Sequence, residues 1–204
     1  GHYNILAIPV VDEQNVLVGV VTVDDIIDVI HEEASEDLAY LSGSSQPLHT
    51  LIDASPLVVS RARLPWLGAA LLGGLFTGTI LNFFTGTLTE FISPSVFIPV
   101  IMAMGGHHGI QTSTMFIRGL ATGEIRGILE PLWKEFLVGC IMGAVCGLGL
   151  GAVASVWLGS WMLGVVAGLA MFFALNSSAM MGVLLPTFFH RLGIDPAITA
   201  GPFI

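Results

Sequence analysis

The sequence predicts a mainly α-helical protein: a polytopic bundle of transmembrane helices preceded by a small soluble α/β segment. Hydrophobic residues make up 54% of the 204 positions and charged residues only 10%, whereas a soluble globular chain carries about 25% charged residues. The charge is also uneven, because residues 1–60 hold most of the carboxylates and no Lys or Arg. This segment therefore accounts for the net charge of −9. Such an acidic segment argues against nucleic acid as a partner and favours cations.

Long uncharged stretches predict four complete membrane spans and the beginning of a fifth. A helix needs about 20 mainly apolar residues to cross a bilayer core. Residues 64–84 and 91–117 each supply one span, and residues 136–189 are long enough for two, with a break expected at residues 158–160. A last apolar stretch opens at Pro196.

The basic residues predict the orientation of these spans. An in-out-in-out path places all six Lys and Arg side chains on one face, and short loops rich in Lys and Arg face the cytoplasm. We therefore expect a multi-pass protein of the cell membrane whose acidic N-terminal segment is cytoplasmic. The six residues are Arg61, Arg63, Arg118, Arg126, Lys134 and Arg191.

The N-terminal segment reads as strand, turn, strand and helix. Residues 5–11 and 16–23 are rich in Val and Ile and flank a polar turn at residues 12–15. Thr22 can cap a helix that starts near Asp24. Two strands and one helix are too little to fold alone, so we expect the chain to be part of a longer protein. Four apolar residues are expected to form the buried face of this helix: Ile26, Ile27, Val29 and Ile30.

Five carboxylates follow one another along this helix, namely Asp25, Asp28, Glu33, Glu36 and Asp37. On a helix they lie near one another, and no Lys or Arg within the first 60 residues offsets them. One interpretation is an ordinary solvated helix face. The other is a site for a hard divalent cation, and Mg²⁺ suits it because this ion keeps most of its waters and needs only one or two carboxylates.

The second predicted span carries an unusual polar run. Pro99 and the pair Gly105-Gly106 are expected to weaken the helix, which would leave carbonyl and side-chain oxygens facing water. Irregular backbone of this kind is tolerated in a membrane only against protein or a watery cavity. The run therefore indicates passage of a hydrated ion, or alternatively a kink packed against a neighbouring helix. The candidate pore-lining residues of this run are Gly105, Gly106, His107, Gln111 and Thr112.

Other polar residues in or beside the spans have two interpretations each. His107 and His108 could bind a softer metal such as Zn²⁺, although neighbours on a helix diverge by about 100° and two more ligands would be needed. Residues 176–178 (Asn-Ser-Ser) favour hydrogen bonds between helices. Asp195 either simply begins the fifth span or lies at a pore mouth.

Small residues in the first and third spans indicate packing rather than chemistry. Glycines recur about one helical turn apart, which lets helix backbones approach closely in lipid. They are Gly68, Gly73, Gly74 and Gly78 in the first span and Gly139, Gly143, Gly147 and Gly151 in the third. Cys140 and Cys146 point to different faces of the same helix, so no disulfide is expected between them.

Taken together, these residues resemble the MgtE family of magnesium channels and transporters over the whole chain. Residues 1–43 look like the C-terminal part of a CBS-type cytoplasmic regulatory domain, residues 44–62 like a connecting "plug" helix and residues 63–204 like the transmembrane pore domain. The motifs that carry the resemblance are residues 8–12 (IPVVD), 18–25 (VGVVTVDD), 33–37 (EASED), 99–111, 118–121 (RGLA) and 191–197 (RLGIDPA).

The resemblance implies a homodimer with five spans per subunit and a pore on the two-fold axis, lined by spans two and five. It also implies that cytoplasmic Mg²⁺, bound to the carboxylates at Asp25, Asp28, Glu33, Glu36 and Asp37, holds the pore shut. The sequence departs from the family pattern at two pore positions, where His107 and Gly201 stand in place of Asn. The family's pore carboxylate would lie beyond Ile204.

The sequence thus predicts a Mg²⁺ transporter that is also regulated by Mg²⁺, with other divalent cations possible as substrates. Two alternatives remain: a non-conducting, membrane-anchored sensor of metal or nucleotide, and a transporter that prefers Co²⁺ or Zn²⁺ because of His107. Catalysis is not expected, because the sequence offers no pairing of a nucleophile with a base.

Overall fold

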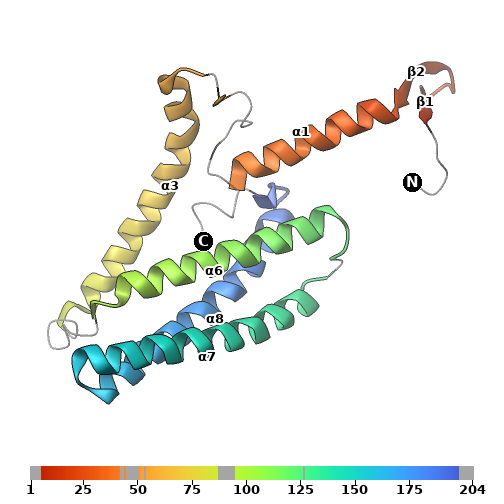
Figure 1. Cartoon of the computed structure of the whole chain (residues 1–204). Helices are drawn as coiled ribbons and strands as arrows, with labels where there is room; N and C mark the ends of the chain where they lie inside the picture. Colours follow the sequence, from red (N-terminus) through yellow and green to blue (C-terminus); the bar gives the residue numbers. More distant parts are fainter. Residues whose placement is uncertain are drawn as a thin grey trace.

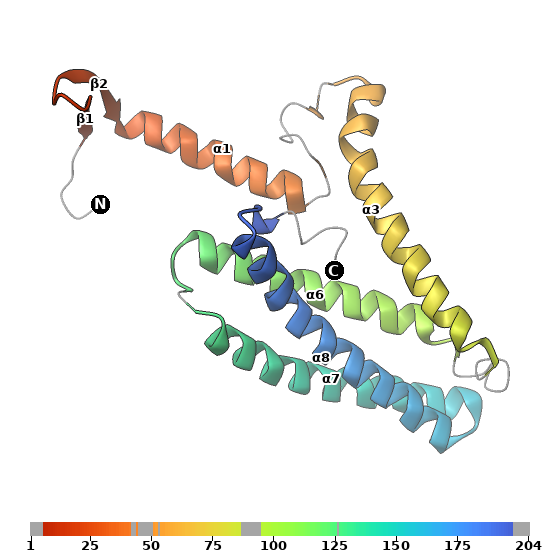
Figure 2. The same cartoon turned by 180° about the vertical axis from the view of Figure 1, so that it is seen from behind.

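The computed structural model describes residues 6–41, 44, 51–52, 54–86, 95–125 and 127–197. A two-stranded hairpin and a long helix lead into the four long helices of the apolar region (Figure 1). Helices α6, α7 and α8 lie side by side, whereas α3 diverges from them and α1 extends away from their end (Figures 1 and 2). The elements are β1 Ala7–Val11, β2 Leu17–Thr22, α1 Val23–Leu41, α3 Pro56–Phe83, α6 Ile98–Ala121, α7 Leu129–Leu158 and α8 Trp161–Arg191.

The N-terminal hairpin and helix confirm the predicted order of elements. β1 and β2 pair antiparallel, with Ala7 opposite Thr22. Asp12 Oδ1 accepts hydrogen bonds from the backbone N–H groups of Gln14 and Val16, which closes the turn between the strands. Asn15 adopts the left-handed conformation at φ 59°, which Asn tolerates better than most residues.

The predicted buried face of the first helix is not buried. Ile26, Ile27, Val29 and Ile30 of α1 are each at least 42% exposed, and the hydrophobic residues of the hairpin are exposed as well. The hairpin continues beyond the N-terminal end of α1 rather than covering its side (Figure 1). A two-stranded sheet and one helix do not provide a second layer over an apolar face, so this surface lacks a partner among the described residues.

Among the residues that the structure describes, three helices are long and apolar enough to span a membrane, namely α3, α7 and α8. They correspond to the first, third and fourth predicted spans. The predicted break between the third and fourth is confirmed, because α7 ends at Leu158 and Gly159 adopts a left-handed φ of 64° before α8 begins. α6 occupies the position of the second span and has 24 residues, about 36 Å at 1.5 Å per residue, but its polar run lowers its hydropathy.

The first long helix crosses the boundary that we placed between connecting helix and pore domain. α3 runs without interruption from Pro56 to Phe83, so residues 56–62 are continuous with the first span. Pro56 stands at the start of the helix, where its missing N–H removes no hydrogen bond. The boundary at residue 63 is therefore not marked by a change in secondary structure.

The break predicted within the second span is wrong. α6 is one continuous helix from Ile98 to Ala121. Pro99 lies in its first turn, where a proline removes no hydrogen bond from the helix. The Gly105-Gly106 pair does not interrupt the helix either, and Gly105 is buried facing α8. Gly106 has no atom within 4 Å of an added Cβ, so only Gly105 of the pair faces α8 on one side of a regular helix.

The glycine series of the third span packs as expected. A Cβ atom added at Gly147 of α7 would lie 2.6 Å from the carbonyl oxygen of Gly168 in α8, and one at Gly151 would lie 2.9 Å from that of Gly164. Small residues at four-residue spacing therefore allow the two backbones to touch. By contrast, Gly68 and Gly73 of α3 have no atom within 4 Å of such a Cβ.

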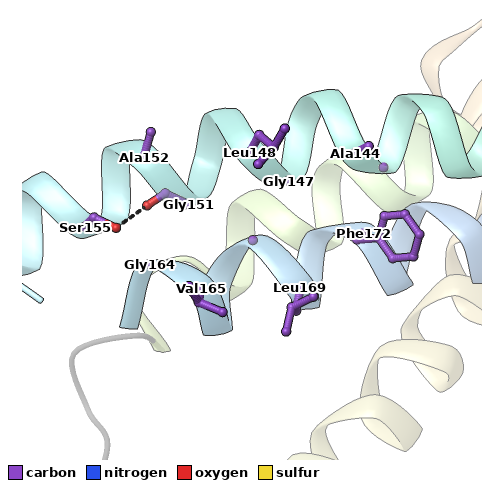
Figure 3. Close-up of a pocket in the computed structure, with 12 residues that line it drawn as sticks. Ala144, Gly147, Leu148, Gly151, Ala152, Ser155, Gly164, Val165, Leu169 and Phe172 are labelled. Carbon is purple, nitrogen blue, oxygen red and sulfur yellow. Dashed lines mark hydrogen bonds between the residues drawn. The ribbon is translucent and has the colours of Figure 1, made fainter. Parts of the chain in front are cut away.

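An apolar groove of about 490 Å³ runs along this contact between α7 and α8 (Figure 3). Its lining is aliphatic, aromatic and glycine, apart from the hydroxyl of Ser155. That hydroxyl already donates a hydrogen bond to the carbonyl oxygen of Gly151 at 2.8 Å, drawn as a dashed line in Figure 3. The groove therefore offers no free polar group and belongs to helix packing.

Replacing Gly147 with alanine is expected to destabilise the bundle by about 1–3 kcal/mol, because α7 and α8 must separate to admit the methyl group. The matched control is Gly149→Ala on the same helix, where an added Cβ meets nothing within 4 Å. Thermal unfolding in detergent compares the two. Equal melting temperatures for both variants would contradict the packing seen here.

Candidate cation path and acidic helix

The polar run of α6 is divided between two faces of the helix. His107 and Gln111, one turn apart, are exposed. Gly106 is partly exposed. His108 and Thr112 are buried, at 7% and 2% exposure. Because residues four apart share one face of a helix, these two pairs define two polar stripes, one facing outward and one inward. The inward stripe also contains Gly105, Gly109 and Ser113.

The side chain of Thr112 points into the helix bundle and is not part of the outward stripe. Its Oγ1 donates a hydrogen bond of 3.0 Å to Oε2 of Glu135 in α7. Its Cβ lies 2.8 Å from where a Cβ on Gly182 of α8 would be, so α6 and α8 approach closely at this level. Of the six predicted pore residues, His107 and Gln111 thus share an exposed face, and Gly105 and Thr112 lie on the opposite one. Gly106 is partly exposed, and Gly201 lies outside the described residues.

Glu135 is a polar partner that our sequence reasoning did not single out. It is a partly buried carboxylate in the second turn of α7, just before an apolar run that continues to Leu158. A charged residue at the edge of such a run is costly in lipid and usually has a function, and that signal could have identified it.

The polar residues of α8 bond between helices, as predicted. The Ser178 hydroxyl donates to the carbonyl oxygen of Gly105 in α6. Oδ1 of Asn176 accepts a weak hydrogen bond of 3.5 Å from Sγ of Cys140 in α7. Both cysteines, Cys140 and Cys146, are free thiols, which confirms that they form no disulfide. These contacts join all three helices near the middle of the bundle.

The two adjacent histidines do not converge on a common site. His107 is exposed, whereas His108 is buried with its Nε2 unbonded, and the Ser113 hydroxyl on the same inward stripe is also unbonded. Within the part of the chain that the structure describes, no three His, Cys, Asp or Glu side chains are grouped closely enough to hold a metal ion. A transition-metal site at His107 and His108 would therefore need ligands from elsewhere.

The acidic residues of α1 lie in different surroundings. Asp28 and Glu33 are exposed, Glu36 is partly buried and the Asp37 side chain lies outside the described set. Oδ2 of Asp25 accepts hydrogen bonds from the hydroxyl and the backbone N–H of Thr22, at 2.6 and 2.8 Å. Asp25, the third residue of the helix, thus bonds back to Thr22 at the N-cap position, while the Thr22 hydroxyl donates to Asp25 rather than accepting from a helix N–H.

This cap lowers the pKa of the Asp25 carboxyl below its usual value. The larger cause is the hydrogen bond from the Thr22 hydroxyl, and the smaller is the hydrogen bond from the Thr22 backbone N–H. Since the pKa is lowered in the folded state, the cap's contribution to stability is complete above the ordinary Asp pKa of about 3.9 and is lost as the pH falls through the lowered value. Asp25 is therefore ionised at neutral pH, with Oδ2 bonded in the cap and Oδ1 without a hydrogen bond among the described residues.

Asp195 follows α8 and begins a short turn. Its Oδ1 accepts a hydrogen bond of 2.8 Å from the backbone N–H of Ala197, whereas the fifth span that it was predicted to begin lies outside the described residues. The described basic residues of the bundle lie at this same end: Arg118 in the last turn of α6, Lys134 in the second turn of α7 and Arg191 at the end of α8. This is the grouping expected for the predicted in-out path, with Arg126 outside the described residues.

Residues 98–204, about half of the chain, match the family model MgtE, a divalent cation transporter, and residues 2–32 match the CBS domain. The long helical bundle, with an α/β segment before it, thus matches a family of transporters and not of enzymes. The chain belongs to the MgtE family, which confirms the resemblance predicted from the motifs.

The similarity extends over the full length of the chain. It is 39% identical over 205 residues to the magnesium transporter MgtE of Bacillus subtilis, covering 100% of this chain and 45% of that protein. It is 36% identical to the magnesium transporter MgtE of Enterococcus faecalis, covering 99% and 44%, and 35% identical to that of Thermus thermophilus, covering 99% and 45%. The chain thus spans slightly less than half the length of these relatives.

Proposed function

We propose that this protein moves hydrated Mg²⁺ across the cell membrane into the cytoplasm through a pore between two copies of the chain. The proposal is supported by membership of a divalent cation transporter family and by similarity to proteins named as magnesium transporters. In this arrangement the N-terminal segment lies in the cytoplasm, on the side of the basic residues.

The observation that carries the proposal is the outward polar stripe of α6. His107 and Gln111 are exposed on a helix whose other face is packed against α8. Polar side chains exposed to lipid are unfavourable, so this face needs water or another protein surface opposite it. A second copy of the chain with a water-filled pore between the two stripes meets that requirement. The amide oxygen of Gln111 can then bond the waters of a hydrated ion.

We also propose that cytoplasmic Mg²⁺ regulates the pore through α1. Asp28 and Glu33 are exposed on this helix, and Glu36 is within one turn of Glu33. Since no three carboxylates converge among the described residues, the ion would bridge α1 to another domain through one or two carboxylates and several waters. Bound Mg²⁺ neutralises the repelling carboxylates and holds the closed arrangement, whereas its loss frees the helix.

A second candidate is transport of softer cations. Its supporting observation is that His107 is exposed on the same stripe as Gln111, where imidazole is a ligand for Zn²⁺ or Co²⁺. A non-conducting membrane-anchored sensor of metal or nucleotide is a further alternative, which a flux measurement separates from both.

The test is Mg²⁺ uptake by the full-length protein in cells that lack their own magnesium transporters. We expect growth to be restored at low external Mg²⁺ and to be reduced by Gln111→Leu, with Met115→Leu, an exposed apolar position one turn further along α6, as the control. Normal expression without rescue would reject transport. Rescue that Gln111→Leu leaves unchanged would reject this stripe as the path.

A further inference from the structure

Tyr40 joins the acidic helix to the membrane bundle. It lies in the last turn of α1, and Figures 1 and 2 both show this end of α1 close to the end of α8. Its ring packs against the pair formed by Ile117 of α6 and Ala197 after α8. It also meets the ring of Trp66 in α3 edge-on, with the ring centroids 6.2 Å apart. One side chain of α1 therefore contacts three separate parts of the membrane region.

The hydroxyl of Tyr40 is bonded to a proposed cation ligand. It donates a hydrogen bond of 2.9 Å to Oε1 of Glu36, one turn earlier on α1. This bond raises the pKa of the Tyr40 phenol, with burial and the charges of Glu36 and Asp195 acting in the same direction. Since the pKa is raised, the phenol stays protonated at neutral pH and remains a donor. Tyr40 therefore occupies one oxygen of Glu36 whenever the helix has this conformation.

The junction also contains a polar group without a partner. Nε1 of Trp66 is buried and bonds to nothing in the described part of the chain. A buried N–H without an acceptor is unfavourable, so this arrangement of the junction is less stable than one that supplies an acceptor. The contact between Tyr40 and Trp66 is therefore not part of a fully satisfied core.

We propose that Tyr40 is a positioning residue that couples cation binding at Glu36 to the ends of α3, α6 and α8. The hydroxyl of Tyr40 and a divalent cation compete for the same carboxylate, because a cation that takes the Oε1 atom of Glu36 displaces the hydrogen bond. The released ring then changes its contact with Trp66 and Ile117, which moves the end of the membrane bundle. This inference rests on the proposed regulation through α1 and names the side chain that transmits it.

The test is Tyr40→Phe in the full-length protein reconstituted in liposomes. Phenylalanine has the same ring but cannot bond Glu36, so the Mg²⁺ concentration that half-inhibits flux is expected to fall about two- to tenfold, as the loss of one competing hydrogen bond predicts. Calorimetric titration of the same protein with Mg²⁺ should show the same change in affinity. Because the ring of phenylalanine is already free of Glu36, flux at the lowest internal Mg²⁺ should not exceed the wild-type level.

Tyr40→Leu separates binding from coupling. It removes both the hydroxyl and the edge-on contact with Trp66, so Mg²⁺ is expected to bind at least as tightly as to wild type while inhibiting flux less. Ser60→Ala is the control, since it removes an exposed hydroxyl of α3 that bonds only the carbonyl oxygen of Pro56 in the same helix.

Two outcomes would overturn the inference: unchanged inhibition and affinity in Tyr40→Phe, or equal shifts in Tyr40→Phe and Ser60→Ala. Wild-type flux that ignores internal Mg²⁺ would reject the proposed regulation itself, whatever the variants do. Absence of wild-type flux would reject the proposed transport.

Discussion

His107→Asn is expected to shift the ion preference of transport from Co²⁺ and Zn²⁺ toward Mg²⁺, by about tenfold in the ratio of uptake rates, which corresponds to roughly 1.4 kcal/mol. The imidazole of His107 is exposed on the same stripe of α6 as Gln111. An amide oxygen in its place is a harder ligand and bonds the waters of Mg²⁺ without attracting softer ions. Uptake of each cation into liposomes, alone and in competition, measures the ratio.

His108→Asn is the matched control for this experiment. His108 neighbours His107 in the sequence but faces the interior of the bundle, at 7% exposure. Its replacement is expected to lower stability and total flux without changing the ratio between ions. If both variants shift the ratio equally, the division of α6 into an outward and an inward stripe does not describe the path. Identical ion profiles for wild type and His107→Asn would defeat the role of the imidazole.

Glu135→Leu is expected to destabilise the bundle by about 1–3 kcal/mol and to abolish most of the transport, because it leaves the buried hydroxyl of Thr112 without its acceptor. Glu135→Gln keeps an acceptor oxygen at the same place and should retain most of the stability. Thermal unfolding in detergent and uptake in liposomes give the two readouts.

The double variant Thr112→Val with Glu135→Leu tests the cause of this loss. Removing both partners leaves no polar group unbonded, so much of the stability lost in Glu135→Leu is expected to return. Additive losses from the two substitutions would instead show that the hydrogen bond between α6 and α7 is not the source of the effect.

The helices and their order were predictable because each depends on local composition. Uncharged stretches identified α3, α7 and α8, and the Gly159 turn between the last two was predicted as a break at residues 158–160. The hairpin and the Thr22 cap followed from alternating Val and Ile residues and from a hydroxyl placed before a run of acids. Motifs spread over the whole length were enough to indicate the family, which the comparisons confirmed.

The predictions that were wrong considered a residue without the side chains and helices that it contacts in the fold. Pro99 and the Gly105-Gly106 pair were expected to break α6, but a proline in a first turn removes no bond and the helix continues through both glycines. The apolar residues of α1 were assigned a buried face that no other described element covers. Glu135 was passed over because its partner, Thr112, is 23 positions away in the sequence.

By itself, the sequence determined that this chain enters a membrane, which helices it forms and which family it belongs to, because hydropathy, periodicity and motif order are properties of the linear chain. The tertiary structure decided which side of α6 is free, placing His107 and Gln111 outward and Thr112 against Glu135. It also decided that Tyr40 meets Trp66 and Ile117. Such assignments depend on how helices rotate and approach one another, and that is set by close contacts between residues far apart in the sequence.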